Sequence, residues 1–286
     1  MLIAGLPLLF MLAGCSLASE WGGGAYAAEA TDGVLVGDVG QGGGDLSETP
    51  VAKSPDASAK PAQPAEATKP PADKPKPPAS KPANRKVIAL TFDDGPDGKY
   101  TPKVLDVLKQ YQIKATFFLV GSQVEKYPDV VKRIVDEGHD IGNHSWSHKD
   151  LSKLDAKALD EQLARTQQAI EKASGFVPDL VRAPYGAISP ALIDYLHDNE
   201  LKHVAWTVDP KDWAGTSVSV MRDNIRKHAK PGGIILLHSF GGRKNALDHT
   251  LQLLPLIIGD LQKAGYEFAT VDDMIGADLA KASAIK

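Results

Sequence analysis

From residue 87 onward, short apolar runs alternate with longer amphipathic stretches. Seven runs rich in β-branched and aromatic residues have the length and composition of buried strands; they cover 87–92, 115–120, 140–143, 179–182, 203–208, 233–238 and 266–271. Between them, apolar residues recur at helical spacing in 101–111, 128–138, 155–173, 189–199, 217–229 and 246–264. This α/β alternation predicts parallel βα units, and about seven strands favour a small, distorted (β/α) barrel over an open sheet.

The first 85 residues lack this pattern. No aromatic residue occurs between Tyr26 and Phe92, and residues 51–86 contain nine prolines and nine alanines together with several lysines. Such a stretch cannot bury enough apolar surface to offset the entropy lost on folding. We therefore expect a disordered Pro/Ala/Lys-rich linker over 16–85 and a folded domain over 86–280.

The N-terminus has the features of a bacterial export signal. Its apolar run, which ends at Leu12-Ala13-Gly14-Cys15, is shorter than the roughly 20 residues that span a bilayer. The residues before Cys15 resemble a lipobox, so residues 1–15 are expected to be a lipoprotein-type signal peptide and Cys15 the lipidated residue. No Lys or Arg precedes the run, so the true start codon could lie upstream, and a plain secretory signal is the alternative.

Composition narrows the class of partner. The chain has 286 residues and a formal net charge of -4. Residues 1–50 hold six acids and no Lys or Arg, and residues 51–86 hold eight bases and three acids, so residues 87–286 carry -3 and are mildly acidic. An acidic domain argues against a nucleic-acid partner, whose phosphates require a basic face. Cys15 is the single cysteine in the sequence, so no intrachain disulfide can form.

Polar clusters follow five of the predicted strands. They are Asp93-Asp94, the stretch 144–148 (HSWSH), the stretch 182–186 (RAPYG), the stretch 209–213 (DPKDW) and His238. In a parallel barrel, the C-terminal ends of the strands meet on one face, where active sites form. The two histidines of HSWSH are four residues apart, close enough to share one ion. The pattern therefore predicts an active site with a metal ion.

The stretches TFDDGP, HSWSH, RAPYG, DPKDW and LLHS, in this order, resemble the five motifs of polysaccharide deacetylases with the NodB homology domain, carbohydrate esterase family 4. The resemblance covers about residues 86–275. It implies that Asp94, His144 and His148 bind one divalent metal ion. Two imidazoles and a carboxylate suit zinc, with cobalt or nickel as alternatives.

The resemblance also implies the catalytic groups. Asp93 is expected to be the general base, oriented by Arg182, and His238 the general acid. Asp209 is expected to hold the His238 imidazolium, while Asp212 would only cap or brace its loop. The backbone N–H of Tyr185 would stabilise the oxyanion.

Trp213 and Leu236 are expected to line the acetyl pocket. The chain departs from many relatives at Ala183, where a second proline is common, and at Ser239, where an acid is common; both departures bear on substrate preference. The other histidines are interpreted as structural or surface residues.

These assignments imply metal-dependent N-deacetylation of N-acetylglucosamine units in a carbohydrate polymer. Peptidoglycan is the favoured polymer, because a domain tethered to a membrane through an N-terminal lipid would meet it outside the cytoplasm. Chitooligosaccharides, poly-N-acetylglucosamine and xylan are alternatives, and so is a secreted, unanchored protein. Two further hypotheses are a catalytically inactive sugar-binding lipoprotein and a structural cell-wall tether whose metal only stabilises the fold. The sequence gives no prediction of oligomeric state.

Overall fold

The computed structural model describes residues 85–277. The predicted signal peptide, Cys15 and nearly all of the predicted linker lie outside the described residues, as do residues 278–286. Those predictions therefore stay predictions.

Seven parallel strands form one curved sheet, which confirms the predicted fold class. The strands are β1 (Lys86–Asp93), β2 (Thr116–Leu119), β3 (Asp140–Asn143), β4 (Leu180–Val181), β5 (Lys202–His203), β6 (Gly233–His238) and β7 (Tyr266–Phe268). Their order is β5-β4-β3-β2-β1-β6, and β7 pairs with the first residues of β1. The sheet curls into a half-barrel, so the C-terminal ends of its strands share one face.

The predicted strand 203–208 is divided between the two edges of this sheet. Its start belongs to β5 and pairs with β4, whereas Val208 forms an isolated parallel bridge with Ile235 of β6. Between them, the carbonyl groups of Val204 and Ala205 accept hydrogen bonds from the Arg182 guanidinium. This segment therefore crosses from β4 to β6 with its backbone partly satisfied by a side chain.

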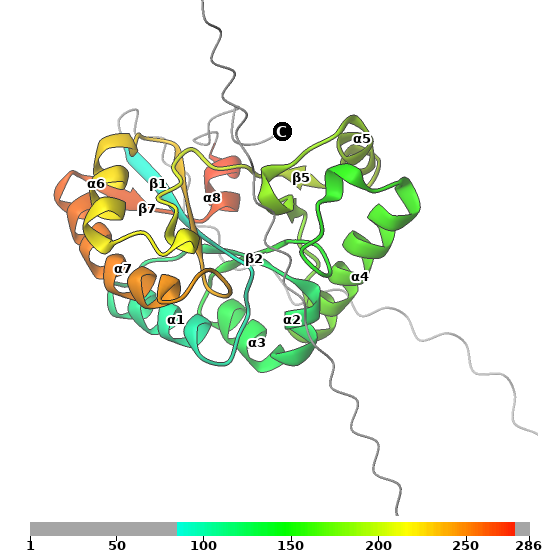
Figure 1. Ribbon diagram of the computed structural model, residues 1–286, viewed down its shortest axis with the longest axis horizontal. Coiled ribbons are helices and arrows are strands. Elements are labelled where there is room, and N and C mark those ends of the chain that lie inside the picture. The colour runs from blue at the N-terminus through cyan, green and yellow to red at the C-terminus, as the bar shows by residue number, and fades with distance from the viewer. Residues whose placement is uncertain (1–84, 278–286) are drawn as a thin grey trace, which may run out of the picture. The chain divides into compact units, whose positions relative to one another are not determined.

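Eight helices accompany the strands: α1 (Tyr100–Gln110), α2 (Gly121–Lys126), α3 (Pro128–Asp136), α4 (Ala156–Ser174), α5 (Pro190–Asp198), α6 (Val218–His228), α7 (Ala246–Lys263) and α8 (Val271–Gly276), all within residues 85–277. Six match the predicted stretches to within two residues at each end. The short helices α2 and α8 were not predicted, because six residues are too few to show helical periodicity. Figure 1 shows α1, α3 and α7 along one side of the sheet and α8 on the opposite side, where Val271 and Met274 join the inner core cluster.

Local sequence signals fix the ends of the longest helix. Asp155 caps the N-terminus of α4 by accepting a hydrogen bond from the backbone N–H of Ala158. Gly175 ends the helix in the left-handed conformation, with φ 72°. Among the described residues, no helix combines the length and apolar character needed to cross a membrane.

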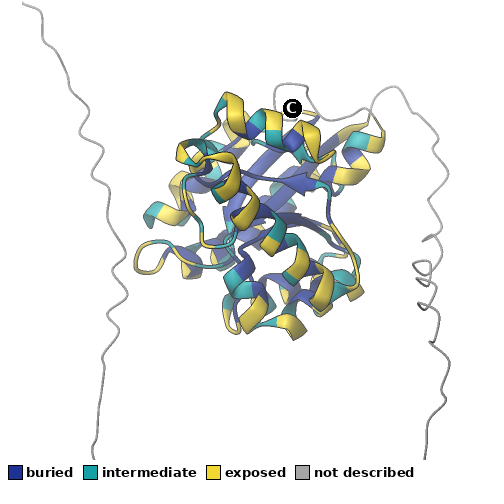
Figure 2. Cartoon of the chain, turned by 90° about the vertical axis from the view of Figure 1, so that its right-hand side faces the viewer, coloured by how far each residue is buried: buried dark blue, intermediate teal, exposed yellow. Residues whose placement is uncertain are grey.

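The core covers both faces of the central strands. Figure 2 shows the strands buried and the outer faces of the helices exposed. On one face, Leu90 and Phe117 pack in a large cluster with residues of α1, α3 and α7. On the other face, Ala89 and Phe118 pack inside the half-barrel with Ile234. Burial on both faces explains why these strands are apolar throughout rather than alternating.

Candidate active site

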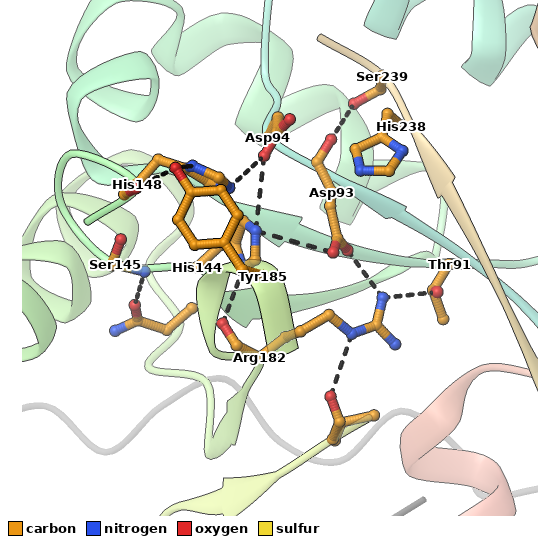
Figure 3. Close-up of polar contacts among 12 residues, drawn as sticks. Thr91, Asp93, Asp94, His144, Ser145, His148, Arg182, Tyr185, His238 and Ser239 are labelled. Atoms are coloured by element: carbon orange, nitrogen blue, oxygen red, sulfur yellow. Dashed lines mark hydrogen bonds and ion pairs between the residues drawn. The ribbon is translucent and has the colours of Figure 1, made fainter. Parts of the chain in front are cut away.

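Residues of four predicted polar clusters, Asp93-Asp94, HSWSH, RAPYG and His238, lie together at the C-terminal ends of the strands (Figure 3). The fifth cluster, DPKDW, joins them through the contact of Asp212 with His238. Asp93 ends β1, and His238, which ends β6, is its register partner on the neighbouring strand. Eight non-glycine residues in the described part have positive φ, and six of them lie in loops after these strands: Asp94, Ser145, His148, Tyr185, Lys211 and Asn245. Left-handed backbone is costly for such residues, and its concentration here is typical of a functional site.

Asp94, His144 and His148 form a cluster that could hold a metal ion. One ligand atom from each lies within 4.8 Å of the others. Asp94 Oδ1 is 3.2 Å from His148 Nε2 and 3.5 Å from His144 Nε2. Tetrahedral ligands at the usual zinc distances of about 2.0–2.1 Å lie about 3.3 Å apart, so these separations fit a shared cation.

Two further observations support the same fit. Asp94 Oδ1 is buried and has no hydrogen-bond partner among the described residues, which is unfavourable unless a cation satisfies it. His144 Nδ1 lies 2.7 Å from the carbonyl oxygen of Arg182. That contact fixes the tautomer in which Nδ1 carries the proton and the Nε2 lone pair is available to a metal. The residues present therefore fit a divalent cation.

His148 is held by a different contact. Its Nδ1 lies 3.2 Å from the hydroxyl oxygen of Tyr185, and the two rings pack edge to face with centroids 4.7 Å apart. Tyr185 itself has φ 61° and is 70% exposed. The side chain of Tyr185 thus orients a predicted ligand from the solvent side, a role that the sequence did not indicate.

The electrostatics of the cluster favour an ionised carboxylate. Burial raises the pKa of the Asp94 carboxyl, but the neighbouring imidazoles of His144, His238 and His148 outweigh it and lower that pKa to about 2. Burial lowers the pKa of His148 and exceeds the effect of Asp94. An ionised Asp94 and a neutral His148 are forms that bind metals, whereas burial lowers the pKa of His144 but the Asp93 and Asp94 carboxylates outweigh it and raise that pKa in the metal-free protein.

Asp93 lies next to the cluster in a buried ion pair. Arg182 Nη1 donates to Asp93 Oδ1 at 2.8 Å and to the hydroxyl oxygen of Thr91 at 2.7 Å. The guanidinium is fully buried and stacks on the ring of Phe118 at 4.1 Å. Asp93 Oδ2 lies 3.7 Å from His144 Nε2. The ion pair therefore holds Oδ1 of Asp93 and leaves Oδ2 beside the candidate metal site.

The structure corrects the predicted partner of His238. Asp212, not Asp209, contacts the imidazole: its Oδ1 is 2.8 Å from His238 Nδ1, and its Oδ2 accepts from the His238 backbone N–H and from Thr250 Oγ1. Asp209 Oδ1 instead accepts from the backbone N–H of Lys211 at 2.7 Å. Burial lowers the pKa of His238, but the charge and hydrogen bond of Asp212 outweigh it and raise that pKa to about 9.

The two residues predicted to line the acetyl pocket differ in exposure. Leu236 lies in β6 and is almost completely buried, whereas Trp213, in the 3₁₀ turn Asp212–Ala214, is 40% exposed. Thr91, Thr250 and Asn143 support the site and were missed in the sequence. Asn143 Oδ1 accepts from the backbone N–H of Ser145 and so shapes the loop between the two histidines. The position of Thr91 as a single polar residue inside the apolar run VIALTF was the available signal for that residue.

Comparisons with known proteins agree with this geometry. The family model for polysaccharide deacetylase matches residues 80–204. A peptidoglycan-N-acetylglucosamine deacetylase of Bacillus cereus is 40% identical over 191 residues, which cover 67% of this chain and 69% of the relative. The chain belongs to the polysaccharide deacetylase family. The predicted resemblance is thereby confirmed.

Other members extend the comparison. The peptidoglycan-N-acetylmuramic acid deacetylase PdaC of Bacillus subtilis is 41% identical over 192 residues, which cover 67% of this chain but 39% of that protein. The crystal structure of a peptidoglycan N-acetylglucosamine deacetylase in complex with 4-naphthalen-1-yl-N-oxidanyl-benzamide matches with a TM-score of 0.65 and 38% identity. That match covers 70% of this chain and 92% of the other. These members of one family are named for different sugars.

Proposed function

We propose that this polysaccharide deacetylase removes the N-acetyl group from N-acetylglucosamine units of peptidoglycan in a metal-dependent hydrolysis that releases acetate. The observation that carries the proposal is the cluster of Asp94, His144 and His148 beside the buried pair of Asp93 and Arg182. Members of the family named as peptidoglycan deacetylases support the choice of polymer.

The three clustered residues would hold a divalent cation, with zinc as the proposed metal. When bound, the cation supplies Lewis acidity toward the acetamide carbonyl and toward water. The contacts of His144 with the Arg182 carbonyl and of His148 with Tyr185 fix the two rings for this task.

Asp93 is proposed as the general base. Its carboxylate is held by Arg182 through one oxygen, so the other oxygen can accept a proton from the attacking water. The oxygen of that water bonds to the acetyl carbon. The backbone N–H of Tyr185 is proposed to donate to the oxyanion that develops.

His238 is proposed as the general acid. Asp212 holds Nδ1 and favours the charged imidazolium, so Nε2 is the nitrogen that can give up a proton. Transfer of this proton to the sugar nitrogen accompanies cleavage of the bond between the acetyl carbon and that nitrogen. The products are acetate and a free amine on the sugar. Trp213 and Leu236 are proposed to line the space for the acetyl methyl group.

The location is also proposed. The lipobox-like residues before Cys15 support an extracytoplasmic lipoprotein whose lipid anchors it to the membrane, and the proline-rich stretch supports a tether between that anchor and the domain. Palmitate labelling of the wild-type protein but not of Cys15→Ala is the expected result. Labelling that persists in the variant would contradict the anchor.

The enzymatic proposal is tested by acetate release from peptidoglycan, chitooligosaccharides, poly-N-acetylglucosamine and acetylxylan, with and without a chelator. We expect release from peptidoglycan that stops with chelator and returns on addition of zinc. The thermal melting profile should be largely retained after chelation, because a catalytic metal is not needed for folding. A metal-loaded protein that releases acetate from none of the polymers contradicts the proposal.

A further inference from the structure

A group of positively charged side chains lies beside the candidate active site and has no role in the chemistry above. We call Lys211, Arg243 and Lys244 the basic rim. The backbone N–H of Arg243 donates to the Trp213 carbonyl at 2.9 Å. A Cβ atom added to Gly215 would lie 3.9 Å from Arg243 Cβ. The loop after β6 and the turn that contains Trp213 therefore form one continuous surface.

The loop after β6 also reaches the candidate metal site formed by Asp94, His144 and His148. A Cβ atom added to Gly241 would lie 3.4 Å from Asp94 Oδ2. Gly241 and Gly242 have φ of 75° and 80°, a conformation that glycine adopts freely and that lets the backbone approach so closely. Arg243 follows two residues after Gly241, and two residues span at most about 7 Å. The rim therefore lies within reach of a sugar adjoining the one that reacts.

Nearby carboxylates compensate the positive charge of the basic rim only in part. Lys211, Arg243 and Lys244 are exposed, and none forms an ion pair with another residue in the part of the chain that the structure describes. The nearby acids have other partners. Asp212 is bound to His238 and Thr250, and Asp248 accepts from the hydroxyl of Tyr100 at 3.3 Å.

Two acids of this surface keep an uncompensated charge. The Asp209 carboxylate accepts from the backbone N–H of Lys211 and the exposed Asp248 from the neutral hydroxyl of Tyr100, so they offset two of the three cations. The surface thus keeps a net positive charge although the whole chain carries a net charge of -4. Local charge of one sign beside a cleft attracts ligands of the opposite sign.

We propose that the basic rim binds a carboxylate carried by the sugar next to the reacting unit. The inference rests on the proposed function and names the substrate feature that the site selects. An arginine fork matches a carboxylate in two hydrogen bonds, and a lysine adds a point charge. Trp213, whose carbonyl oxygen accepts from the Arg243 backbone N–H, is 40% exposed and offers apolar surface to the sugar ring. The stem peptides of peptidoglycan carry free carboxylates, and so does the lactyl group where the peptide has been removed, whereas chitin and xylan backbones lack them.

The test compares two substrates that differ only in charge. One is a peptidoglycan glycan fragment with its carboxylates intact, and the other is the same fragment with its carboxylates converted to amides. The readout is the ratio of kcat/KM for the charged fragment to kcat/KM for the amidated one. For Arg243→Gln/Lys244→Gln we expect this ratio to fall about fivefold, the effect of losing one or two exposed charge pairs.

Lys230→Gln is the matched control. Lys230 is exposed and precedes β6, at the opposite end of the strand from the rim, so it removes a charge of the same sign without touching the proposed subsite. This control should keep the wild-type ratio. A double variant that keeps the wild-type ratio overturns the proposal, whether its activity on the two fragments is unchanged or falls equally on both.

Two measurements keep the test independent of folding and of catalysis. In the wild-type protein, added salt should lower kcat/KM more for the charged fragment than for the amidated one, because salt screens exposed charges. Equilibrium binding of the two fragments to wild-type protein and the double variant should show the same preference and the same loss. If the wild-type protein releases no acetate from any substrate, the proposed function fails, while the binding measurement still decides whether the rim selects a carboxylate.

Discussion

The two ends of the half-barrel treat the same residue types in opposite ways. At the C-terminal ends of the strands, the contact with Asp212 raises the pKa of His238, whose side chain is 12% exposed, to about 9. At the other end, His139 Nδ1 accepts from the backbone N–H of Ala115, and its buried Nε2 has no hydrogen-bond partner among the described residues. Burial there lowers the pKa of His139 to about 4. Contact with a carboxylate, and not burial, decides which histidine is charged.

The carboxyl groups show the reverse contrast. Imidazoles surround Asp94 and lower its pKa to about 2 despite burial. Burial and the negative charges of Asp272 and Asp273 raise the pKa of Asp140 to about 6, although hydrogen bonds to that side chain oppose the shift. Ionised groups of both signs are therefore concentrated at the end that carries the proposed chemistry. Paired substitutions at the two ends test this division.

The largest expected difference concerns the two histidine environments. His148→Gln removes a proposed ligand, so we expect deacetylation to fall at least about a thousandfold and the bound metal to be lost. His139→Gln, at the other end, should keep both, because glutamine can still accept from the Ala115 N–H. Acetate release and elemental analysis of the purified proteins check this. Equal losses in both variants would contradict the division between the ends.

Replacement of Asp93 and of the half-buried Asp140 should have the next largest difference in effect. Asp93→Asn removes the proposed base and leaves the buried Arg182 guanidinium without its counter-charge. We expect activity to fall by about 10²–10⁴-fold and the free energy of unfolding by about 3 kcal/mol. Urea denaturation and acetate release measure the two effects.

Asp140→Asn is the control for that change. Its carboxyl is disfavoured in the ionised form, so at pH 8 the variant should be as stable as the wild-type protein or slightly more stable. A large loss of stability in Asp140→Asn, or none in Asp93→Asn, would show that the two carboxylates are not distinguished in this way.

The third prediction concerns Asp212 and Asp209. In metal-free protein, Asp212→Asn should lower the pKa of His238 from about 9 toward its ordinary value, because the carboxylate that contributes most to raising it is removed. Asp209→Asn should leave that pKa unchanged, since Asp209 binds the backbone N–H of Lys211 instead. NMR titration of the His238 ring measures both. The opposite pattern would restore the assignment expected from the sequence.

That assignment illustrates what the sequence could reveal. The order of strands and helices was predictable, because buried strands and amphipathic helices leave long periodic patterns. The two aspartates of DPKDW are three residues apart in an irregular loop, where no period tells which one points inward. Lys211, with φ 60°, reverses the chain between them and buries Asp212 completely. The conformation of this turn depends on tertiary packing and could not be predicted from the local sequence.

The divided strand 203–208 has a similar cause. Its composition is that of one strand, yet the guanidinium of Arg182 bonds the carbonyl groups in the middle and interrupts the ladder. The grouping of Asp94, His144 and His148 was predictable only because the three residues sit in recognisable motifs. The Tyr185 hydroxyl on His148 was not, because it depends on how two loops approach each other.

The smallest expected effect is in the pH dependence of stability. His139 has a pKa of about 4 in the folded protein and about 6.5 when unfolded, so below pH 6.5 the unfolded chain binds a proton that the folded chain does not. This group therefore lowers stability by about 2 kcal/mol between pH 7 and pH 5. Asp140 acts in the opposite direction, since its raised pKa makes the folded chain bind the extra proton between pH 6 and pH 4.

The two contributions largely cancel in the wild-type protein, so single variants are needed to reveal them. On acidification from pH 7 to pH 5, His139→Gln should lose less stability than the wild-type protein, and Asp140→Asn should lose more. Urea denaturation at the two pH values gives the difference, and the double variant should return close to wild-type behaviour. Parallel pH profiles for all four proteins would mean that neither group is perturbed by its surroundings. The contrast between the two ends of the half-barrel would then reduce to the contacts at the proposed active site alone.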